Sequence, residues 1–293
     1  EVPEQAEPDP DFPTVAFPNP EEPGAIDMAL ALAGRTGADL VVANDPDADR
    51  CAIAAVVDDR WRMLTGDELG LLLADHMIRR GAKGVLASSV VSSGALAALA
   101  AARGRDHVTT LTGFKWIARA PGLGFGYEEA IGFCPDPAHV RDKDGIATSV
   151  VAASLVASLK AQGRSVWDEL ERLARLHGLH VSSPLTFRVE QIEQIASGMA
   201  RLRAQPPSVL AGSPVVEVSD LSQGYRGLPP TDGVLVLTEA GDRVIARPSG
   251  TEPKLKCYLE VILPVADGEA LPWDQARERL EAIKGAFAEI IGL

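Results

Sequence analysis

Apolar stretches of strand length and apolar stripes of helical period alternate along the chain up to about residue 180. A leucine- and valine-rich segment at 39–43 and an apolar segment at 51–57 predict two buried strands on either side of a polar loop. Residues 67–80 show an apolar stripe behind two acidic residues, which is typical of an amphipathic helix. Similar patterns predict a helix at 25–37, a strand at 85–89 and helices at 94–102 and 145–161. The alternation predicts α/β domains with mixed, largely parallel sheets and helices on both faces.

The pattern changes after about residue 182, where strands follow one another directly. Strands are predicted at 215–218, 233–237, 243–247 and 256–263, flanked by helices at 190–204 and 273–291. This order favours a smaller α+β domain at the C-terminal end. Length alone suggests two domains, with one large or three small domains as the alternatives.

The first 23 residues contain seven prolines and seven acidic residues. A segment of this composition cannot build a core, so a disordered tail is one interpretation. Phe12, Val15 and Phe17 favour another, an extended segment that lies on a partner surface. No strand–helix unit precedes the strand at 39–43, and this indicates that upstream sequence is missing.

Composition narrows the classes of partner. The 293 residues are 46% hydrophobic and 24% charged, as in ordinary globular proteins, and carry a net charge of -13. Such an acidic chain is a poor match for nucleic acid or an anionic membrane. No apolar run reaches the roughly 18 residues of a membrane span. Three cysteines without a C-x-x-C motif are interpreted as buried apolar residues, and we expect a cytoplasmic monomer or dimer.

The polar loop at 44–50 carries three carboxylates, on Asp45, Asp47 and Asp49. Their mutual repulsion is costly unless a cation lies among them, and hard oxygen ligands suit Mg²⁺ or Ca²⁺. An EF-hand is excluded because its glycine and glutamate positions hold Arg50 and Val56. The loop therefore predicts Mg²⁺ with open coordination positions, and Arg50 would neutralise a phosphate there. An Asx-rich turn between two strands is the alternative.

A second polar loop, at 247–254, follows a predicted strand. It combines two cations, two hydroxyls and a glycine that lets backbone N–H groups approach a ligand. Arginine binds phosphate through two parallel hydrogen bonds, so the loop is a candidate phosphate site. A polar hairpin turn with incidental charges is the alternative. The candidate residues are Arg247, Ser249, Gly250, Thr251 and Lys254.

Three further segments carry groups that suit a sugar phosphate. Residues 112–117 place Lys115 beside aromatic side chains, and Glu128 and Glu129 form an acidic pair. A glycosidase is disfavoured because adjacent strand residues point to opposite faces. Residues 141–145 offer cations and N–H groups before a helix. Solvated lysines and helix caps are the alternatives.

The remaining polar clusters carry no recognised motif. The five histidines lack metal-binding spacing, and most are interpreted as structural. A nucleophile elbow would need G-x-S-x-G, which is absent. A group of four serines is therefore interpreted as loop and N-cap residues, namely Ser88, Ser89, Ser92 and Ser93.

Together these segments resemble the α-D-phosphohexomutase superfamily, in the branch of phosphopentomutases and their bacterial phosphomannomutase relatives. Asp45–Arg50 is similar to its metal-binding loop, and Arg247–Lys254 to its phosphate-binding loop. Thr112–Ile117 and Glu128–Gly132 are similar to its sugar-recognition segments. The order and spacing agree over nearly the whole chain, so the resemblance implies three parts, at 1–62 for the end of domain 2, at 63–180 for domain 3 and at 181–293 for domain 4.

The resemblance implies a mutase. A phosphoserine on another domain would give its phosphate to a sugar monophosphate, and a sugar bisphosphate would return the other phosphate. Mg²⁺ on the three loop aspartates would bridge the phosphoserine. The candidate catalytic residues are Arg50 and Lys115, and the candidate substrate-binding residues are Thr112, Gly113, Lys115, Glu128, Lys143, Arg247, Ser249, Gly250, Thr251 and Lys254.

Two departures from the family pattern limit this expectation. Ala130 stands where many members have serine, so the preference for hexose or pentose stays open. No serine is followed by histidine, so no segment like the family's phosphoserine motif is found. We therefore expect a missing N-terminal domain or chain and no turnover by this chain alone. A noncatalytic sugar-phosphate-binding protein and a Mg²⁺-dependent phosphatase are the alternatives.

Overall fold

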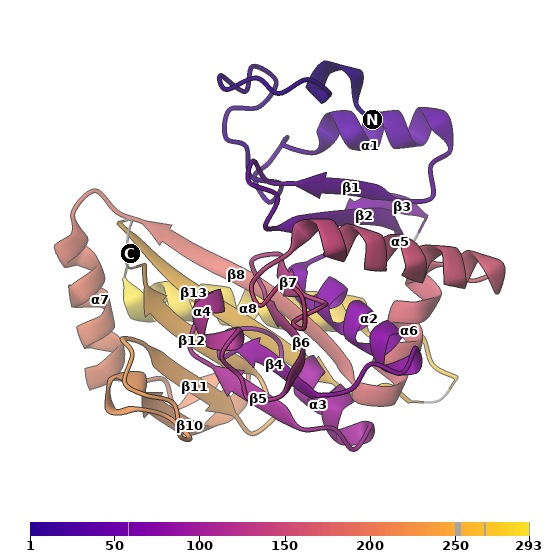
Figure 1. Cartoon of the computed structure of the whole chain (residues 1–293). Coiled ribbons are helices and arrows are strands. Elements are labelled where there is room, and N and C mark those ends of the chain that lie inside the picture. Colours follow the sequence, from indigo (N-terminus) through magenta and orange to yellow (C-terminus); the bar gives the residue numbers. More distant parts are fainter. Residues whose placement is uncertain (58, 250–252, 267, 293) are drawn as a thin grey trace. The chain divides into compact units, whose positions relative to one another are not determined.

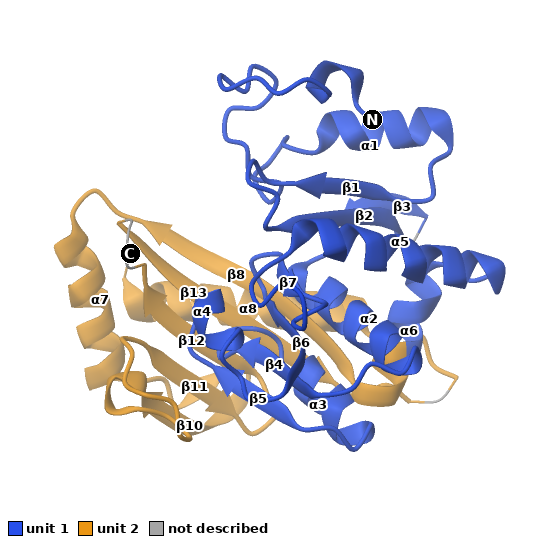
Figure 2. Cartoon of the chain, in the orientation of Figure 1, with its two compact units in different colours: residues 1–172 blue, residues 173–293 orange. Residues whose placement is uncertain are grey.

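The computed structural model describes residues 1–57, 59–249, 253–266 and 268–292 (Figure 1). The chain forms two compact units, residues 1–172 and 173–293 (Figure 2). Helices and sheets occur in both, which confirms the expected α/β class followed by an α+β part. Two sheets lie within the first unit, and its division into two domains stays a prediction.

The first sheet has three antiparallel strands, in the order β1, β2, β3. The strands are β1 (Val41–Asn44), β2 (Cys51–Val57) and β3 (Arg60–Met63). Their connections are too short for parallel pairing, because a parallel pair needs a long crossover. Parallel pairing, expected from the alternation, is therefore confined to the second sheet. Helix α1 (Asp27–Thr36) packs on β1 and β3, and α5 (Gly145–Ala161) covers the other face (Figure 1).

The second sheet places the ends of two parallel strands side by side. Its order is β5, β4, β6, β7, with β4 parallel to both β5 and β6 and with β7 antiparallel to β6. Neighbouring parallel strands end at the same edge, so the residues that follow β4 and β6 meet there. The strands are β4 (Val85–Ser89), β5 (His107–Thr110), β6 (Leu123–Glu128) and β7 (Gly132–Cys134), and the helices are α2 (Gly66–Arg79), α3 (Ala95–Ala102), α4 (Phe114–Ile117) and α6 (Val166–His177).

The second unit contains one antiparallel sheet, in the order β8, β13, β12, β11, β10, β9. Helices α7 and α8 pack on this sheet and share one apolar core with it. The strands are β8 (Leu179–Arg188), β9 (Val209–Leu210), β10 (Ser213–Asp220), β11 (Val234–Thr238), β12 (Arg243–Pro248) and β13 (Lys254–Leu263), and the helices are α7 (Ile192–Ala204) and α8 (Trp273–Ile291).

The proline-rich segment lies against its own chain. It contains the short 3-10 helix η1 (Pro3–Gln5) and several turns, and Gln5 Nε2 donates to Thr14 Oγ1 at 3.0 Å. The expected single extended segment is therefore not found, because prolines and turn residues bend the backbone repeatedly. In the described part of the chain no single helix is long and apolar enough to cross a membrane, and only the pair α5 and α6, bent by 93°, meets those criteria together. All three cysteines are buried and free, as predicted.

Buried charges join α2, α3 and α6 in the first unit. The Asp75 carboxylate is fully buried and is paired with Arg79 at 3.0 Å, with Arg103 at 2.6 Å and with Arg172. A second buried carboxylate, on Glu169, shares Arg79 and Arg172. Buried carboxylates are costly unless they are paired in this way, so the network is a structural feature of the unit.

Candidate functional site

The acidic loop follows β1 and has a fixed shape. The Asp45 carboxylate is buried and accepts two hydrogen bonds from Arg50, from the backbone N–H at 3.0 Å and from Nε at 2.7 Å. Asn44 Nδ2 donates to the Arg50 carbonyl oxygen at 2.8 Å, and Ala48 adopts a left-handed φ of 56°. The turn therefore bends sharply and brings its carboxylates together.

The three aspartates offer a set of oxygen ligands. One carboxylate oxygen each from Asp45, Asp47 and Asp49 lies within 4.8 Å of the others. Asp45 is buried, Asp47 is exposed and Asp49 is intermediate, so a cation can enter from one side. Burial raises the pKa of Asp45, but the hydrogen bonds from Arg50 outweigh it and hold this pKa below its usual value. The donors fit a hard divalent cation such as Mg²⁺.

The start of α5 lies directly beneath the acidic loop. The Gly145 N–H donates to the Ala48 carbonyl oxygen at 3.1 Å. A Cβ atom at Gly145 would lie 2.6 Å from that oxygen, so only glycine allows this approach. The turn at 128–132 joins the same region, because Cys51 N–H donates to the Ile131 carbonyl oxygen at 3.1 Å and Arg50 bridges to Gly132.

Lys143 connects the acidic loop with Phe114 and with the turn at 128–132. Its Nζ lies 2.9 Å from Asp49 Oδ2 and 5.6 Å from the centroid of the Phe114 ring. Both the Lys143 and the Glu128 side chains pack against Gly132. A Cβ atom at Gly132 would lie 2.6 Å from Lys143 Cδ and 3.0 Å from Glu128 Oε1, so the two side chains lie beside each other. Three segments that are distant in sequence thus meet at one lysine.

Glu128 lies at the end of β6 in this cluster. The pKa of Glu128 is raised to about 7, chiefly by burial and also by the neighbouring Glu129 carboxyl group, while Lys143 opposes the rise. A carboxyl with a pKa near neutrality can both donate and accept a proton under physiological conditions. The group is therefore suited to contact sugar hydroxyls.

The residues predicted at 112–115 lie at the start of α4. Gly113 precedes the helix with a φ of 102°, and Thr112 is partly buried beside it. Lys115 is exposed, with its Nζ 5.9 Å from the centroid of the Trp116 ring. Among the described residues Lys115 makes no ion pair with the acidic loop, and Phe114 makes the contact to Lys143 instead. The catalytic role expected for Lys115 stays a prediction.

The predicted phosphate loop belongs to the second unit and is described within it. Arg247 lies in β12 opposite Lys256 of β13, and both are partly or fully exposed. The Ser249 N–H donates to the Lys254 carbonyl oxygen at 2.8 Å, which closes the loop. The predicted residues Gly250 and Thr251 lie outside the described residues.

Family comparisons agree with these segments. Residues 1–57 match the model described as "Phosphoglucomutase/phosphomannomutase, alpha/beta/alpha domain II", and residues 65–176 match that of domain III. Residues 187–272 match the C-terminal domain of the same family. The chain belongs to the phosphoglucomutase/phosphomannomutase family.

Relatives within this family carry several names. The chain is 43% identical over 262 residues to a Haemophilus influenzae protein named "Probable phosphomannomutase", covering 88% of this chain and 53% of that protein. It is 34% identical over 326 residues to the Homo sapiens "Phosphopentomutase", covering 98% and 52%. The solved Paramecium phosphoglucomutase pp63/parafusin has the same fold, with a TM-score of 0.66 at 22% identity, covering 94% and 51%. The chain thus spans about half the length of these relatives.

Polar residues that were not among the predicted site residues lie next to Glu128. Glu129 Oε2 accepts hydrogen bonds from Ser89 Oγ at 3.0 Å and from Ser92 Oγ at 3.1 Å. The interpretation of these two serines as loop and cap residues is therefore incomplete, although Ser93 Oγ does accept from Ala95 N–H near the start of α3. The position of these serines at and just after the end of a predicted strand was the sequence feature that could have indicated a role near the acidic pair.

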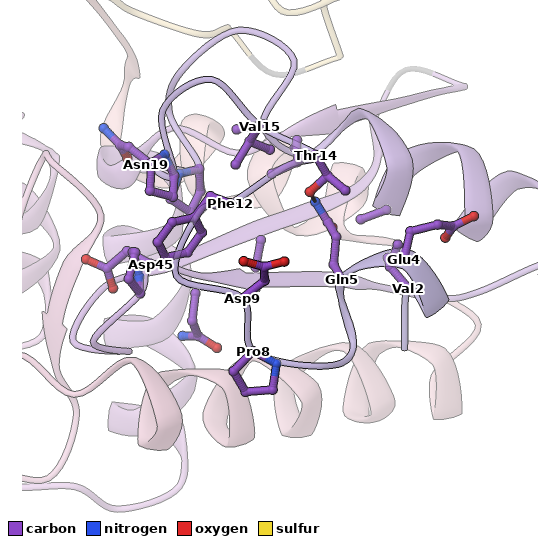
Figure 3. A pocket seen from close by; sticks show the side chains of 18 of the residues that line it. Val2, Glu4, Gln5, Pro8, Asp9, Phe12, Thr14, Val15, Asn19 and Asp45 are labelled. Carbon is purple, nitrogen blue, oxygen red and sulfur yellow. Dashed lines mark hydrogen bonds between the residues drawn. The ribbon is translucent and has the colours of Figure 1, made fainter.

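A cavity of about 560 Å³ lies beside the acidic loop (Figure 3). Its walls come from the proline-rich segment, from α1 and from the end of β1. Figure 3 shows Asp9, Phe12 and Asp45 around it. The cavity is distinct from the Lys143 side of the loop, since neither Lys143 nor Glu128 lines it.

Proposed function

We propose that this chain supplies the cation-, sugar- and phosphate-binding parts of a phosphosugar mutase. The reaction moves a phosphoryl group between two hydroxyls of one sugar through a sugar bisphosphate. One observation carries the proposal, namely the convergence of the acidic loop, Glu128 and Lys143 in a single cluster. The names of the relatives, which include a phosphomannomutase and a phosphopentomutase, support a sugar phosphate as substrate.

The residues of the cluster have distinct roles in this proposal. Asp45, Asp47 and Asp49 hold Mg²⁺, which supplies Lewis-acid stabilisation of charge on a phosphoryl group. Glu128 binds sugar hydroxyls and can hold or release a proton there, because burial raises its pKa to about 7. Lys143 balances the negative charge of Asp49 and faces the sugar side of the cluster.

The second phosphate of the substrate is assigned to the loop of the second unit. Arg247 and Lys254 supply positive charge, and the Ser249 N–H donates to the Lys254 carbonyl oxygen. We further propose that the phosphoryl group comes from a phosphoserine outside these residues, since no serine here is followed by histidine. Ala130 leaves both hexose and pentose phosphates as candidate substrates.

The geometry of Asp45 weighs against a phosphatase. An aspartate nucleophile must present a carboxylate oxygen to the phosphorus atom, whereas Asp45 is buried, is held by two hydrogen bonds from Arg50 and is assigned here to the cation with its remaining acceptor capacity. The other carboxylates of the loop are less enclosed, but Asp49 is paired with Lys143. Release of inorganic phosphate is therefore an outcome that the experiment must be able to detect.

The test combines binding and turnover. Calorimetry measures Mg²⁺ binding, and then the binding of glucose 1-phosphate, mannose 1-phosphate and ribose 1-phosphate with Mg²⁺ present. Phosphorus NMR follows their interconversion by this chain alone and with the unmatched part of the Haemophilus relative supplied. Asp47→Asn should remove Mg²⁺-dependent binding, whereas Asp11→Asn, the same change at an exposed site, should not. Steady phosphate release, or no Mg²⁺-dependent sugar-phosphate binding, would overturn the proposal.

A further inference from the structure

The turn that follows Glu128 has a strained backbone. Ile131 has a φ of 53° although its side chain is β-branched, and this side chain is 1% exposed. β-branched residues avoid the left-handed region, so such a conformation persists only where the surroundings impose it. One constraint is the hydrogen bond from Cys51 N–H to the Ile131 carbonyl oxygen.

Glu129 provides a second set of constraints on the same turn. Its carboxylate is bound by two hydroxyls at the end of β4, from Ser89 and Ser92, which are also 2.8 Å from each other. Its backbone packs against the start of α2, because a Cβ at Gly66 would lie 2.7 Å from the Glu129 carbonyl carbon. Side chain and backbone of Glu129 are therefore both fixed by neighbouring elements.

The surroundings of Glu129 shift the pKa of its carboxyl group upward. Burial raises the pKa of Glu129, and the nearby Asp67 carboxylate raises it further, although the serine hydroxyls oppose this. Asp67 is itself buried and accepts hydrogen bonds at 2.8 Å from the Tyr127 hydroxyl and from Ser93 N–H. The polar network behind the turn thus continues into β6 and the start of α3.

The neighbouring acid has different surroundings. Glu128 lies beside Lys143 and near the acidic loop, whereas Glu129 is bound to the end of β4. Adjacent side chains at the end of a strand point to opposite sides, so fixing one also fixes the direction of the other.

We propose that Glu129 is a positioning residue that holds the strained turn so that Glu128 faces the sugar. Glu129 does not contact the substrate in this role, and it acts through the backbone that it shares with Glu128. The inference rests on the proposed function, because it concerns the same sugar-binding group. It predicts that the loss of the Glu129 anchor weakens sugar recognition and leaves phosphate binding in the second unit intact.

The experiment compares two ligands on the full chain with Mg²⁺ present. Calorimetry gives the affinities for glucose 1-phosphate and for inorganic phosphate, and thermal unfolding is recorded for each variant. Glu129→Ala should weaken glucose 1-phosphate binding by about tenfold or more, because a displaced binding group loses its productive contacts. The affinity for inorganic phosphate should stay unchanged. Glu129→Gln should keep both affinities, since an amide oxygen still accepts the two serine hydrogen bonds.

A matched serine pair covers the case in which Glu129→Ala does not fold. The double variant Ser89→Ala/Ser92→Ala removes the same anchor from the other side and should reproduce the selective loss. Ser88→Ala is the control, because Ser88 is equally buried at the end of β4 but bonds His107 at 3.0 Å instead. This variant should bind both ligands as the wild type does.

The outcomes separate the inference from the proposed function. Wild-type affinity in Glu129→Ala or in the double serine variant would overturn the inference alone. An equal loss of affinity for both ligands would also overturn it, because it would show general damage to the fold. A wild-type chain that binds no sugar phosphate would overturn the proposed function and this inference together.

Discussion

Replacement of Gly145 by alanine tests whether the shape of the acidic loop depends on the start of α5. The added Cβ would lie 2.6 Å from the Ala48 carbonyl oxygen, 2.6 Å from Asn44 Nδ2 and closer still to the Arg50 carbonyl oxygen. Two of these atoms are backbone and cannot rotate away. To reach an ordinary contact of roughly 3.5 Å, the loop must retreat by about 1 Å.

The expected cost follows from two opposing effects. Overpacking of this kind costs about 1 to 3 kcal/mol, whereas alanine is favoured over glycine inside a helix by up to about 1 kcal/mol. We therefore expect Gly145→Ala to lower the free energy of unfolding by about 1 to 2 kcal/mol. The same movement separates carboxylate oxygens that now lie within 4.8 Å of one another, so Mg²⁺ affinity should fall by about tenfold or more.

Urea unfolding and Mg²⁺ titration calorimetry measure the two effects. Gly34→Ala is the matched control, because Gly34 lies inside α1 of the same unit and a Cβ there meets no atom within 4 Å. This control should be at least as stable as the wild type and should bind Mg²⁺ equally. If Gly145→Ala also kept wild-type stability and Mg²⁺ affinity, the loop would not depend on α5, and the reasoning would be refuted.

Three further predictions concern charges in the first unit. Burial raises the pKa of Glu128 from 4.5 to about 7, so between these pH values the folded chain keeps a proton that the unfolded chain loses. The free energy of unfolding therefore falls as pH rises through this window, by at most about 3 kcal/mol. Glu128→Gln should abolish that fall, which urea unfolding at several pH values measures. Lys143→Met removes the ammonium group 2.9 Å from Asp49 Oδ2, which competes with a metal cation for this carboxylate, so Mg²⁺ should bind about tenfold more tightly by calorimetry; unchanged or weaker binding would show that the two cations do not compete. Asp75→Asn removes a buried carboxylate that three arginines share, and Arg79 and Arg172 keep only Glu169; it should cost about 3 kcal/mol in chemical denaturation, whereas an unchanged midpoint would show that the network is dispensable.

Element boundaries could be predicted wherever apolar periodicity and end signals coincide. The segments 51–57, 85–89, 145–161 and 273–291 have the same bounds in the structure as in the sequence. Each is an apolar stretch or apolar stripe of strand or helix length with polar, glycine or proline residues at its ends. Local sequence therefore suffices where tertiary contacts add no conflicting requirement.

Strands that break local rules were not predicted. Strand β6 contains Gly124 and Gly126, and isolated glycines normally weaken a strand. The fold needs them, because a Cβ at Gly124 would lie 2.9 Å from the Lys83 carbonyl carbon. Strand β8 contains Pro184, which is tolerated because β8 is the edge strand of its sheet. Both reasons appear only when the neighbouring strands are placed.

The site could be predicted as a set of residue types but not as an arrangement. The three loop aspartates and Glu128 can be recognised in the sequence because carboxylates at such positions need a cation or a hydrogen-bond donor. Their approach depends on contacts between residues far apart in sequence, such as that of Cys51 with Ile131. Glu129 was not assigned a function, because its role follows from the serines that surround it rather than from its own motif.

The charges of the cluster explain why a phosphate ligand would require the cation. Three aspartates and two basic residues, Arg50 and Lys143, leave one net negative charge around the loop. Both basic groups are already paired with loop carboxylates, at 2.7 and 2.9 Å, so neither is free for a phosphate. A bound Mg²⁺ would change the local charge from minus one to plus one and would share the carboxylates that now hold the two basic side chains. In a chain of net charge -13, the binding of Mg²⁺ would therefore attract a phosphate and would also free Arg50 and Lys143 to bind it.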